Sequence, residues 1–298
     1  MATRKVWYAL SAVLIVISVV SLFTRGLNLG VDFTGGVTVQ STFPSAANRD
    51  AVAAALQRAG YPHAQVTIFG TSRDLSIRLP PTKDSTEAVR GRIEQVLRTV
   101  DPGVQIQQVE VIGPQVGGEL ERSATQALIA TLLLIFGYIA LRFHTWRLSF
   151  GAILAVLHDP ILVLGVFSIT QTSFDLTVVA AMLAVIGYSL NDTVVVFDRI
   201  RERFHVSRRV APIVVLDQSI NQTLSRTIMT KVVTLIVVVA LYALGGPVLK
   251  GFSLALIIGI IAGTYSSIYI SSAAALDCGL TSEHLLPAQS RKPVDNLP

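Results

Sequence analysis

The sequence predicts an α-helical polytopic membrane protein with six spans and one small α+β domain outside the membrane. The chain is 51% hydrophobic and only 14% charged, with a mean hydropathy of +0.59, whereas soluble domains carry about 25% charged residues. Six apolar segments are long enough to cross a bilayer, which takes about 20 residues per helix. One long intervening segment alternates strand and helix patterns instead.

The six spans are predicted near residues 6–24, 123–142, 148–169, 176–197, 224–245 and 251–274. Arg4 and Lys5 precede the first, as in a signal peptide. Its apolar core is long and has no convincing small-residue cleavage site before Arg25, so we expect an uncleaved span. The predicted organisation is residues 1–24 with the first span, an outer domain over 25–122, a bundle over 123–274, and a disordered tail over 275–298.

The basic residues beside the spans predict the orientation. In a six-span arrangement they gather on one side, which the positive-inside rule makes the cytoplasm: Arg4, Lys5, Arg142, Arg147, Arg199, Arg201, Arg203, Arg208 and Arg209. Both termini are then expected to be cytoplasmic in an inner-membrane protein, with 25–122 on the outer side.

The outer segment has the βαββαβ order of a ferredoxin-like domain. Strands are predicted at 37–43, 65–69, 75–79 and 104–112, and helices at 48–59 and 84–99, with Asn48 as an N-cap. The sequence GVDFTGG at 30–36 joins this domain to the first span. Its glycines permit sharp turns, so we predict a hinge at Gly30, Asp32, Gly35 and Gly36, with Asp32 as a turn former.

The fourth span contains a single carboxylate, Asp192. An ionised carboxylate in hydrocarbon costs at least about 2.5 to 3.5 kcal/mol and is typical of ion pathways and charge pairs. An apolar stripe is expected to face lipid, and the opposite polar side, which includes Tyr188, Asn191 and Asp192, to face the bundle: the stripe is Leu183, Ile186, Leu190, Val194 and Phe197. The alternative is that headgroup water wets Asp192 near the membrane boundary.

The fifth span offers a cation. Gln222, Arg226 and Thr230 share one helix face at i, i+4 and i+8. We predict that Arg226 lies beside Asp192, so that proton binding to Asp192 releases the pair and shifts a two-state element. Alternatively, Arg226 extends to the cytoplasmic interface and meets only phosphates.

Two other spans carry weaker signals. The sequence LHDP at 157–160 places Asp159 and a helix-kinking proline near the middle of the third span. A proton relay and a structural hydrogen-bonding role for Asp159 both fit. Gly259 and Gly263 have GxxxG spacing in the sixth span, for which close helix packing is the expected role.

Several phrases together are similar to the SecD/SecF family of protein-export membrane proteins, in the resistance-nodulation-division (RND) superfamily: LGVDFTGG at 29–36, LHDP at 157–160, IGYSLNDTVVVFDRIRE at 186–202, NQTLSRTIMT at 221–230 and GTYSSIYI at 263–270. The resemblance implies an RND-type six-span bundle with one periplasmic domain. It also implies an obligate partner of similar plan, SecD. The family's ion-pathway aspartate, arginine and threonine match Asp192, Arg226 and Thr230.

The resemblance implies an accessory subunit of the Sec translocase that uses the proton-motive force, or sodium in some relatives, to promote translocation and release of preproteins. The expected partners are SecD, the SecYEG channel, YajC, the unfolded preprotein and the lipid bilayer, with no nucleic acid. No enzymatic activity, cofactor or metal is expected, since no nucleotide-binding loop or nucleophile elbow occurs and Cys278 is the one cysteine. The alternatives are half of an RND-type small-molecule exporter and a non-conducting assembly or scaffold subunit.

Overall fold

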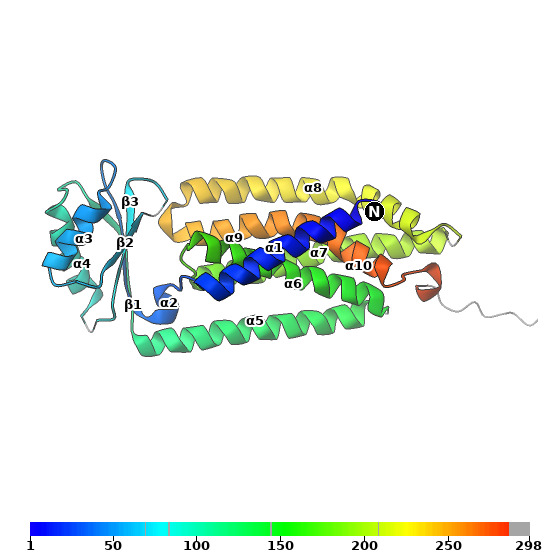
Figure 1. The fold of residues 1–298 in the computed structure, drawn as a ribbon, viewed down its shortest axis with the longest axis horizontal. Coiled ribbons are helices and arrows are strands. Elements are labelled where there is room, and N and C mark those ends of the chain that lie inside the picture. The colour runs from blue at the N-terminus through cyan, green and yellow to red at the C-terminus, as the bar shows by residue number, and fades with distance from the viewer. Residues whose placement is uncertain (69, 83, 144, 208, 286–298) are drawn as a thin grey trace, which may run out of the picture.

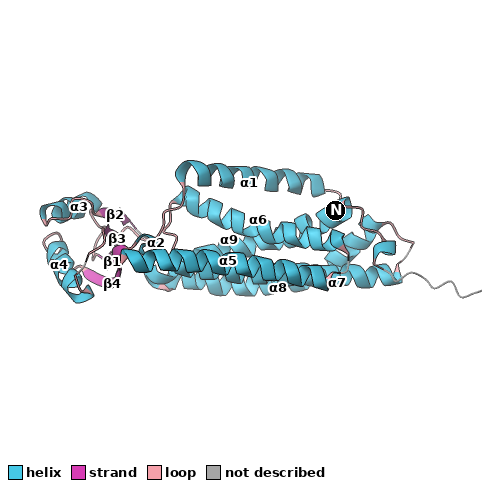
Figure 2. Cartoon of the chain, turned by 90° about the horizontal axis from the view of Figure 1, so that it is seen from below, coloured by secondary structure: helices cyan, strands magenta, loops and turns pink. Residues whose placement is uncertain are grey.

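The computed structural model describes residues 1–285 except Phe69, Lys83, His144 and Arg208. It has two parts, a bundle of long helices and a small sheet domain at one end of that bundle (Figures 1 and 2). Within the described residues, six helical segments are long and apolar enough to cross a membrane. The six predicted spans are therefore confirmed.

The spans are α1 (Arg4–Arg25), α5 (Pro114–Arg142), α6 (Trp146–Thr170), α7 (Leu176–Val206), α8 (Pro212–Leu244) and α9 (Gly246–Tyr265). The last continues through a π-helical turn, Ser266–Ile270, into α10 (Ser271–Asp277). α6, α7 and the α9 segment are the most buried and form the centre, whereas α1, α5 and α8 lie at the periphery. Two clusters of buried side chains fill the core of the bundle, one that includes Phe197 and another that includes Phe167 and Met182.

The outer domain consists of β1 (Gly36–Thr42), α3 (Arg49–Arg58), β2 (Gln65–Ile68), β3 (Asp74–Leu79), α4 (Thr86–Arg98) and β4 (Gln105–Ile112). Its antiparallel sheet has the order β2-β3-β1-β4, which confirms the predicted ferredoxin-like arrangement. Asn48 caps α3 as expected, because its side chain accepts a hydrogen bond from the Ala51 amide at 3.0 Å.

Apolar and polar residues alternate along the strands, so the sheet has one apolar face and one polar face. Val37, Val39, Leu75 and Ile77 are fully buried in the core beneath α3 and α4. The intervening residues are polar and point the other way, because successive side chains of a strand alternate in direction. Since α3 and α4 lie on the side of the sheet away from the bundle (Figures 1 and 2), the polar face is turned toward the helices.

The segment predicted as a hinge forms a docked helical turn, α2 (Val31–Thr34). The Gly30 amide donates to the Phe174 carbonyl at 2.8 Å, just before α7. Gly36 has a φ of 125°, and a Cβ there would lie 2.7 Å from the Leu79 carbonyl oxygen, so glycine is required. The segment is thus held in place in this structure, and its bending remains a prediction.

Part of the C-terminal tail is ordered, unlike the predicted disorder. After α10, a short 3-10 turn covers Ser282–His284. The Thr145 hydroxyl donates to the His284 carbonyl at 2.9 Å, and Arg147 Nε donates to the Cys278 carbonyl at 2.9 Å. These bonds tie residues 275–285 to the start of α6. The remainder of the predicted tail, 286–298, lies outside the described residues.

Candidate ion-coupling site

Asp192 lies near the middle of α7, a helix of 31 residues. Only 6% of its surface is exposed, so the prediction that it faces the bundle is confirmed. The predicted lipid-facing stripe is wrong at three positions, because Ile186, Leu190 and Phe197 are buried in the core. The reason is that α7 packs against α6, α8 and α9 together and therefore has little surface left for lipid.

The cation beside Asp192 is Lys231 of α8. Its Nζ lies 2.7 Å from Asp192 Oδ2, and the side chains of Lys231 and Asp192 are only 5% and 8% exposed. The predicted contact between Asp192 and Arg226 is not formed, since Arg226 lies on the exposed side of α8. Thr230 is also exposed, and its hydroxyl donates to the Arg226 carbonyl at 3.1 Å. Asn191, a weaker candidate for the ion pathway that we predicted on the side facing the bundle, is exposed as well, so that prediction is wrong for Asn191.

The sequence contained a signal for Lys231. The buried row of α8 recurs every four residues: Val215, Ser219, Thr223, Thr227 and Lys231. The row that contains Arg226 is displaced from it by one residue, which is about 100° around a helix of 3.6 residues per turn. Small or hydroxyl side chains that lead to a lysine at this spacing are typical of a face turned into a bundle.

The Tyr188 ring and the hydroxyl groups of Tyr188 and Thr234 complete the contact between α7 and α8, which we call the seam. The Tyr188 and Thr234 hydroxyls share a hydrogen bond of 2.7 Å. Lys231 Nζ lies 4.9 Å from the centroid of the Tyr188 ring, within the range of a cation–π contact. Lys231 is therefore held between the Asp192 carboxylate and the ring.

Asp159 is fully buried in α6 and belongs to a second polar network. Its Oδ2 accepts from the Ser189 and Ser266 hydroxyls at 2.5 and 3.0 Å, and its Oδ1 lies 2.9 Å from His158 Nδ1. His158 Nε2 lies 2.6 Å from the Tyr265 hydroxyl, which accepts from Ser11 of α1 at 3.3 Å. The network joins α1, α6, α7 and α9, which fits the structural role and leaves the relay role a prediction.

The two glycines of the sixth span allow close packing, as predicted. A Cβ at Gly259 would lie 2.3 Å from Val185 Cγ2. A Cβ at Gly263 would lie 3.2 Å from both Asp159 Oδ2 and the Ser189 side chain. The absence of side chains at these positions therefore brings α9 against α7 and against the Asp159 network.

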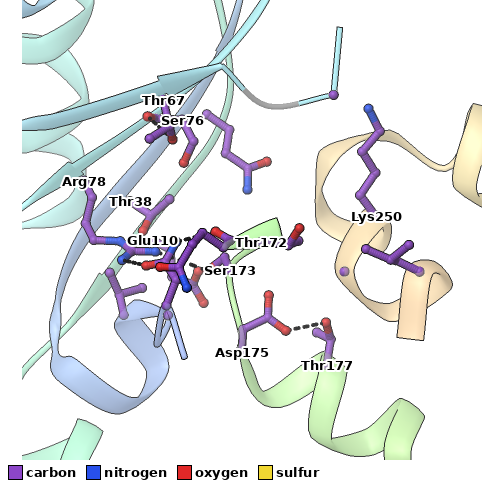
Figure 3. Close-up of a pocket in the computed structure, with 18 of the residues that line it drawn as sticks. Thr38, Thr67, Ser76, Arg78, Glu110, Thr172, Ser173, Asp175, Thr177 and Lys250 are labelled. Carbon is purple, nitrogen blue, oxygen red and sulfur yellow. Dashed lines mark hydrogen bonds between the residues drawn. The ribbon is translucent and has the colours of Figure 1, made fainter. Parts of the chain in front are cut away.

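A polar cavity of about 360 Å³ lies between the sheet and the outer end of the bundle. Figure 3 shows Thr38, Thr67, Ser76, Arg78 and Glu110 on the sheet side, and the segment from Thr172 to Thr177 together with Lys250 on the bundle side. Arg78 bridges the two, because it donates to Asn28 Oδ1 at 2.8 Å and to the Ser173 hydroxyl at 3.2 Å.

Asp32 connects the hinge segment to α7. It is buried, and its Oδ2 accepts a hydrogen bond from the Leu176 amide at 2.8 Å. Asp175 caps the same helix end by accepting from the Val178 amide at 3.0 Å. Asp32 is therefore a hydrogen-bond acceptor for a backbone amide at the N-terminus of α7, rather than only the turn former that we predicted.

Three carboxyl groups meet at this end of the cavity. Burial, reinforced by the neighbouring Asp32 and Asp175 carboxylates, raises the pKa of Glu110 to about 7. Burial also raises the pKa of Asp175, against the opposing hydrogen bonds from Thr177 and Val178. The junction between outer domain and bundle therefore contains a carboxyl group that titrates near neutral pH.

Among the residues that the structure describes, no group of three or more His, Cys, Asp or Glu side chains is placed to hold a metal ion.

Comparison with known proteins assigns the family. Residues 92–281 match the family described as protein export membrane protein SecD/SecF, C-terminal, and residues 20–40 match the SecD/SecF GG motif. The chain belongs to the SecD/SecF family. The protein translocase subunit SecF of Haemophilus influenzae is 47% identical over 100% of this chain and 91% of its own length. The SecF of Escherichia coli O157:H7 is 42% identical over 96% of this chain and 89% of its own length.

Two solved structures of SecDF share the fold. The crystal structure of the translocon-associated membrane protein SecDF from Thermus thermophilus matches 93% of this chain with 36% identity and a TM-score of 0.84. SecDF in a super-membrane-facing form matches the same share at the same identity with a TM-score of 0.68. This chain spans only 38% of each SecDF chain. The two SecDF forms thus differ in how closely the matched part resembles this arrangement.

Proposed function

We propose that this multi-pass membrane protein is an accessory subunit of the Sec translocase, which works with SecD to promote preprotein translocation and release. The observation that carries the proposal is the buried Asp192–Lys231 pair in the middle of the bundle of a chain whose relatives are protein translocase subunits. We place it in a bacterial inner membrane, with the ferredoxin-like domain in the periplasm. The basic loops support cytoplasmic termini.

The coupling step is protonation of Asp192. A proton from the outer side, passing the Tyr188 and Thr234 hydroxyls, converts the carboxylate to a neutral acid and breaks its ion pair with Lys231. The seam between α7 and α8 then relaxes to a second packing. One proton crossing about 100 mV supplies roughly 2.3 kcal/mol, which is enough to bias an equilibrium of that size.

Arg226 and Thr230 form the inner part of the proposed pathway. They precede Lys231 on α8 and therefore lie toward the basic, cytoplasmic end of the helix. Their exposed positions suit contact with the partner subunit SecD rather than with Asp192 directly. Asn191 is also exposed, and it and Asp159 remain weaker members of the pathway.

The outer domain transmits the movement through the hinge segment. Asp32 and Gly30 bind the segment to the start of α7, the helix that carries Asp192. A shift of α7 therefore moves the base of the sheet domain. The different agreement with the two SecDF forms supports a matched part that changes its arrangement.

The proposed partners are SecD, the SecYEG channel, YajC and the unfolded preprotein, and the coupling ion is the proton or, by family resemblance, sodium. An RND-type exporter half fits less well, because the outer domain falls within residues 25–122, several times smaller than docking and porter subdomains would need. A scaffold subunit with purely structural charges is the remaining alternative.

The test uses the chain with its SecD partner and a Sec channel in sealed vesicles. We expect a proton gradient to accelerate late-stage translocation for the wild type and for Glu202→Gln, which neutralises an exposed carboxylate of the same helix. We expect no acceleration for Asp192→Asn. An equal response of Asp192→Asn in an assembled complex would reject the coupling role and favour the scaffold.

A further inference from the structure

Lys231 occupies a closed position rather than a solvated one. It is 4% exposed, with its ammonium 2.7 Å from Asp192 Oδ2 on one side and 4.9 Å from the Tyr188 ring centroid on the other. The ring is itself fixed by the hydrogen bond between Tyr188 and Thr234. The ammonium therefore fills the space next to the carboxylate.

A proton and a sodium ion would interact differently with the Asp192–Lys231 pair. A proton forms an O–H bond with the Asp192 carboxylate and needs no further ligands, and the Tyr188 ring face remains for the released ammonium. A hard metal cation needs a shell of several oxygen ligands. Sodium would also lie beside a second positive charge in a medium of low dielectric, with one carboxylate to neutralise both.

We propose that Lys231 makes the Asp192 site specific for protons, because its ammonium occupies the position that a sodium ion would need. The inference rests on the proposed coupling role of Asp192, and it adds the residue that excludes sodium from the site. In one cycle, an O–H bond forms at Asp192 as the ion pair breaks. The same bond breaks as the proton leaves for the inner side and the pair reforms, so charge and protons balance.

The test separates the two gradients in sealed vesicles that contain the whole complex. One arm imposes a pH gradient in sodium-free choline buffer. The other imposes a sodium gradient at equal pH on both sides, with a protonophore present. We expect the wild type to respond several-fold to the first and less than twofold to the second. Lys231→Arg should keep the proton response, and Lys231→Ser should gain a response to sodium.

A second measurement does not depend on transport. We expect sodium chloride to raise the melting temperature of the Lys231→Ser complex by several degrees over choline chloride at equal ionic strength. The wild type and Val233→Ser, which introduces serine on the exposed side of α8, should show no difference. The Lys231→Ser Asp192→Asn double variant should lose the shift, because the ligand carboxylate is gone.

The possible outcomes distinguish a failure of this inference from a failure of the proposed function. A Lys231→Ser complex without any sodium-dependent shift would overturn the specificity role and leave the coupling role of Asp192 intact. A wild type driven by sodium alone would overturn both the specificity role and the protonation step, and would leave the role as an accessory translocase subunit intact. A wild type that responds to neither gradient, or a full proton response in Asp192→Asn, would instead reject the proposed function.

Discussion

At the scale of single residues, the bundle tolerates buried carboxylates by two different means. Asp192 is neutralised by one cation, Lys231, whereas Asp159 is surrounded by two serine hydroxyls and a histidine ring. The first arrangement is lost when one proton binds, because it consists of a single charge pair. The second has several partners on three helices and is therefore suited to holding those helices together.

Removing a partner of Asp159 should therefore cost stability. Ser189→Ala deletes a hydroxyl donor to a fully buried carboxylate, and an unsatisfied buried group typically costs about 1–3 kcal/mol. We expect a lower melting temperature of the detergent-solubilised protein. Ser225→Ala, an equal change at an exposed position of α8, serves as the control. Identical melting curves for the two variants would contradict a structural role for this network.

The residue scale is also where sequence reasoning was least reliable. The cost of a carboxylate in hydrocarbon was sufficient to single out Asp192, because that argument concerns one residue and its solvent. The choice between Arg226 and Lys231 depended on the rotation of α8, and both belong to polar rows that differ by one position. The small and hydroxyl side chains that lead to Lys231 favour its row, but the local pattern does not exclude the row of Arg226, and packing of α8 against α7 and α9 decides between them.

At the scale of helices, close approach between α7 and α9 depends on two missing side chains. Gly259 faces Val185, and Gly263 faces Asp159 and Ser189. The GxxxG spacing predicted this packing correctly, since small residues four apart leave a continuous groove on one helix face. The sequence did not reveal which helix fills the groove.

Gly259→Ala should destabilise the bundle. Its new methyl group would lie 2.3 Å from Val185 Cγ2, and overpacking of this kind typically costs about 1–3 kcal/mol. We expect a lower midpoint of thermal unfolding in detergent, partly restored by Val185→Ala in the double variant. Gly187→Ala on α7 has no atom within 4 Å of its added Cβ and should be close to neutral. Equal midpoints for Gly259→Ala and Gly187→Ala would refute the packing argument.

At the scale of the whole molecule, the two parts of the chain could be predicted from two different sequence patterns. Long apolar runs predicted the membrane spans, and alternation of apolar and polar residues predicted the strands of the outer domain. The attachment between these two units was not predictable, because Asp32 reaches the Leu176 amide across 144 residues of sequence. Such a contact depends on the final position of both units rather than on neighbouring residues.

The junction between the units should depend on pH. The docked arrangement raises the pKa of Glu110 to about 7, above the ordinary value for glutamate, so it binds more protons than the separated arrangement. Docking should therefore be strongest in acid and weaken as the pH rises through about 7. The groups that act on Glu110 there are Asp32 and Asp175, and Arg78 and Lys250 are the basic residues that line the same cavity.

Spin labels at positions 90 and 244, with Cys278 replaced by serine, would report the distance between α4 and the outer end of α8. We expect a narrow distribution at pH 5.5 and a broader, longer one at pH 8.5 for the otherwise unaltered protein. Glu110→Gln should keep the narrow distribution at both values, since the amide does not ionise. Distributions independent of pH in the parent protein would argue against this junction as the titrating element.

The sheet face above the cavity has one more consequence. Thr38, Thr67, Ser76 and their polar neighbours meet the bundle across space lined mainly by hydroxyl, amide and charged groups. If the two surfaces separated, water would replace the hydrogen bonds between them, and no large apolar patch would be exposed. Exposed apolar patches are what normally make separated domains aggregate. The movement of the outer domain proposed above would therefore not expose an apolar surface that promotes aggregation.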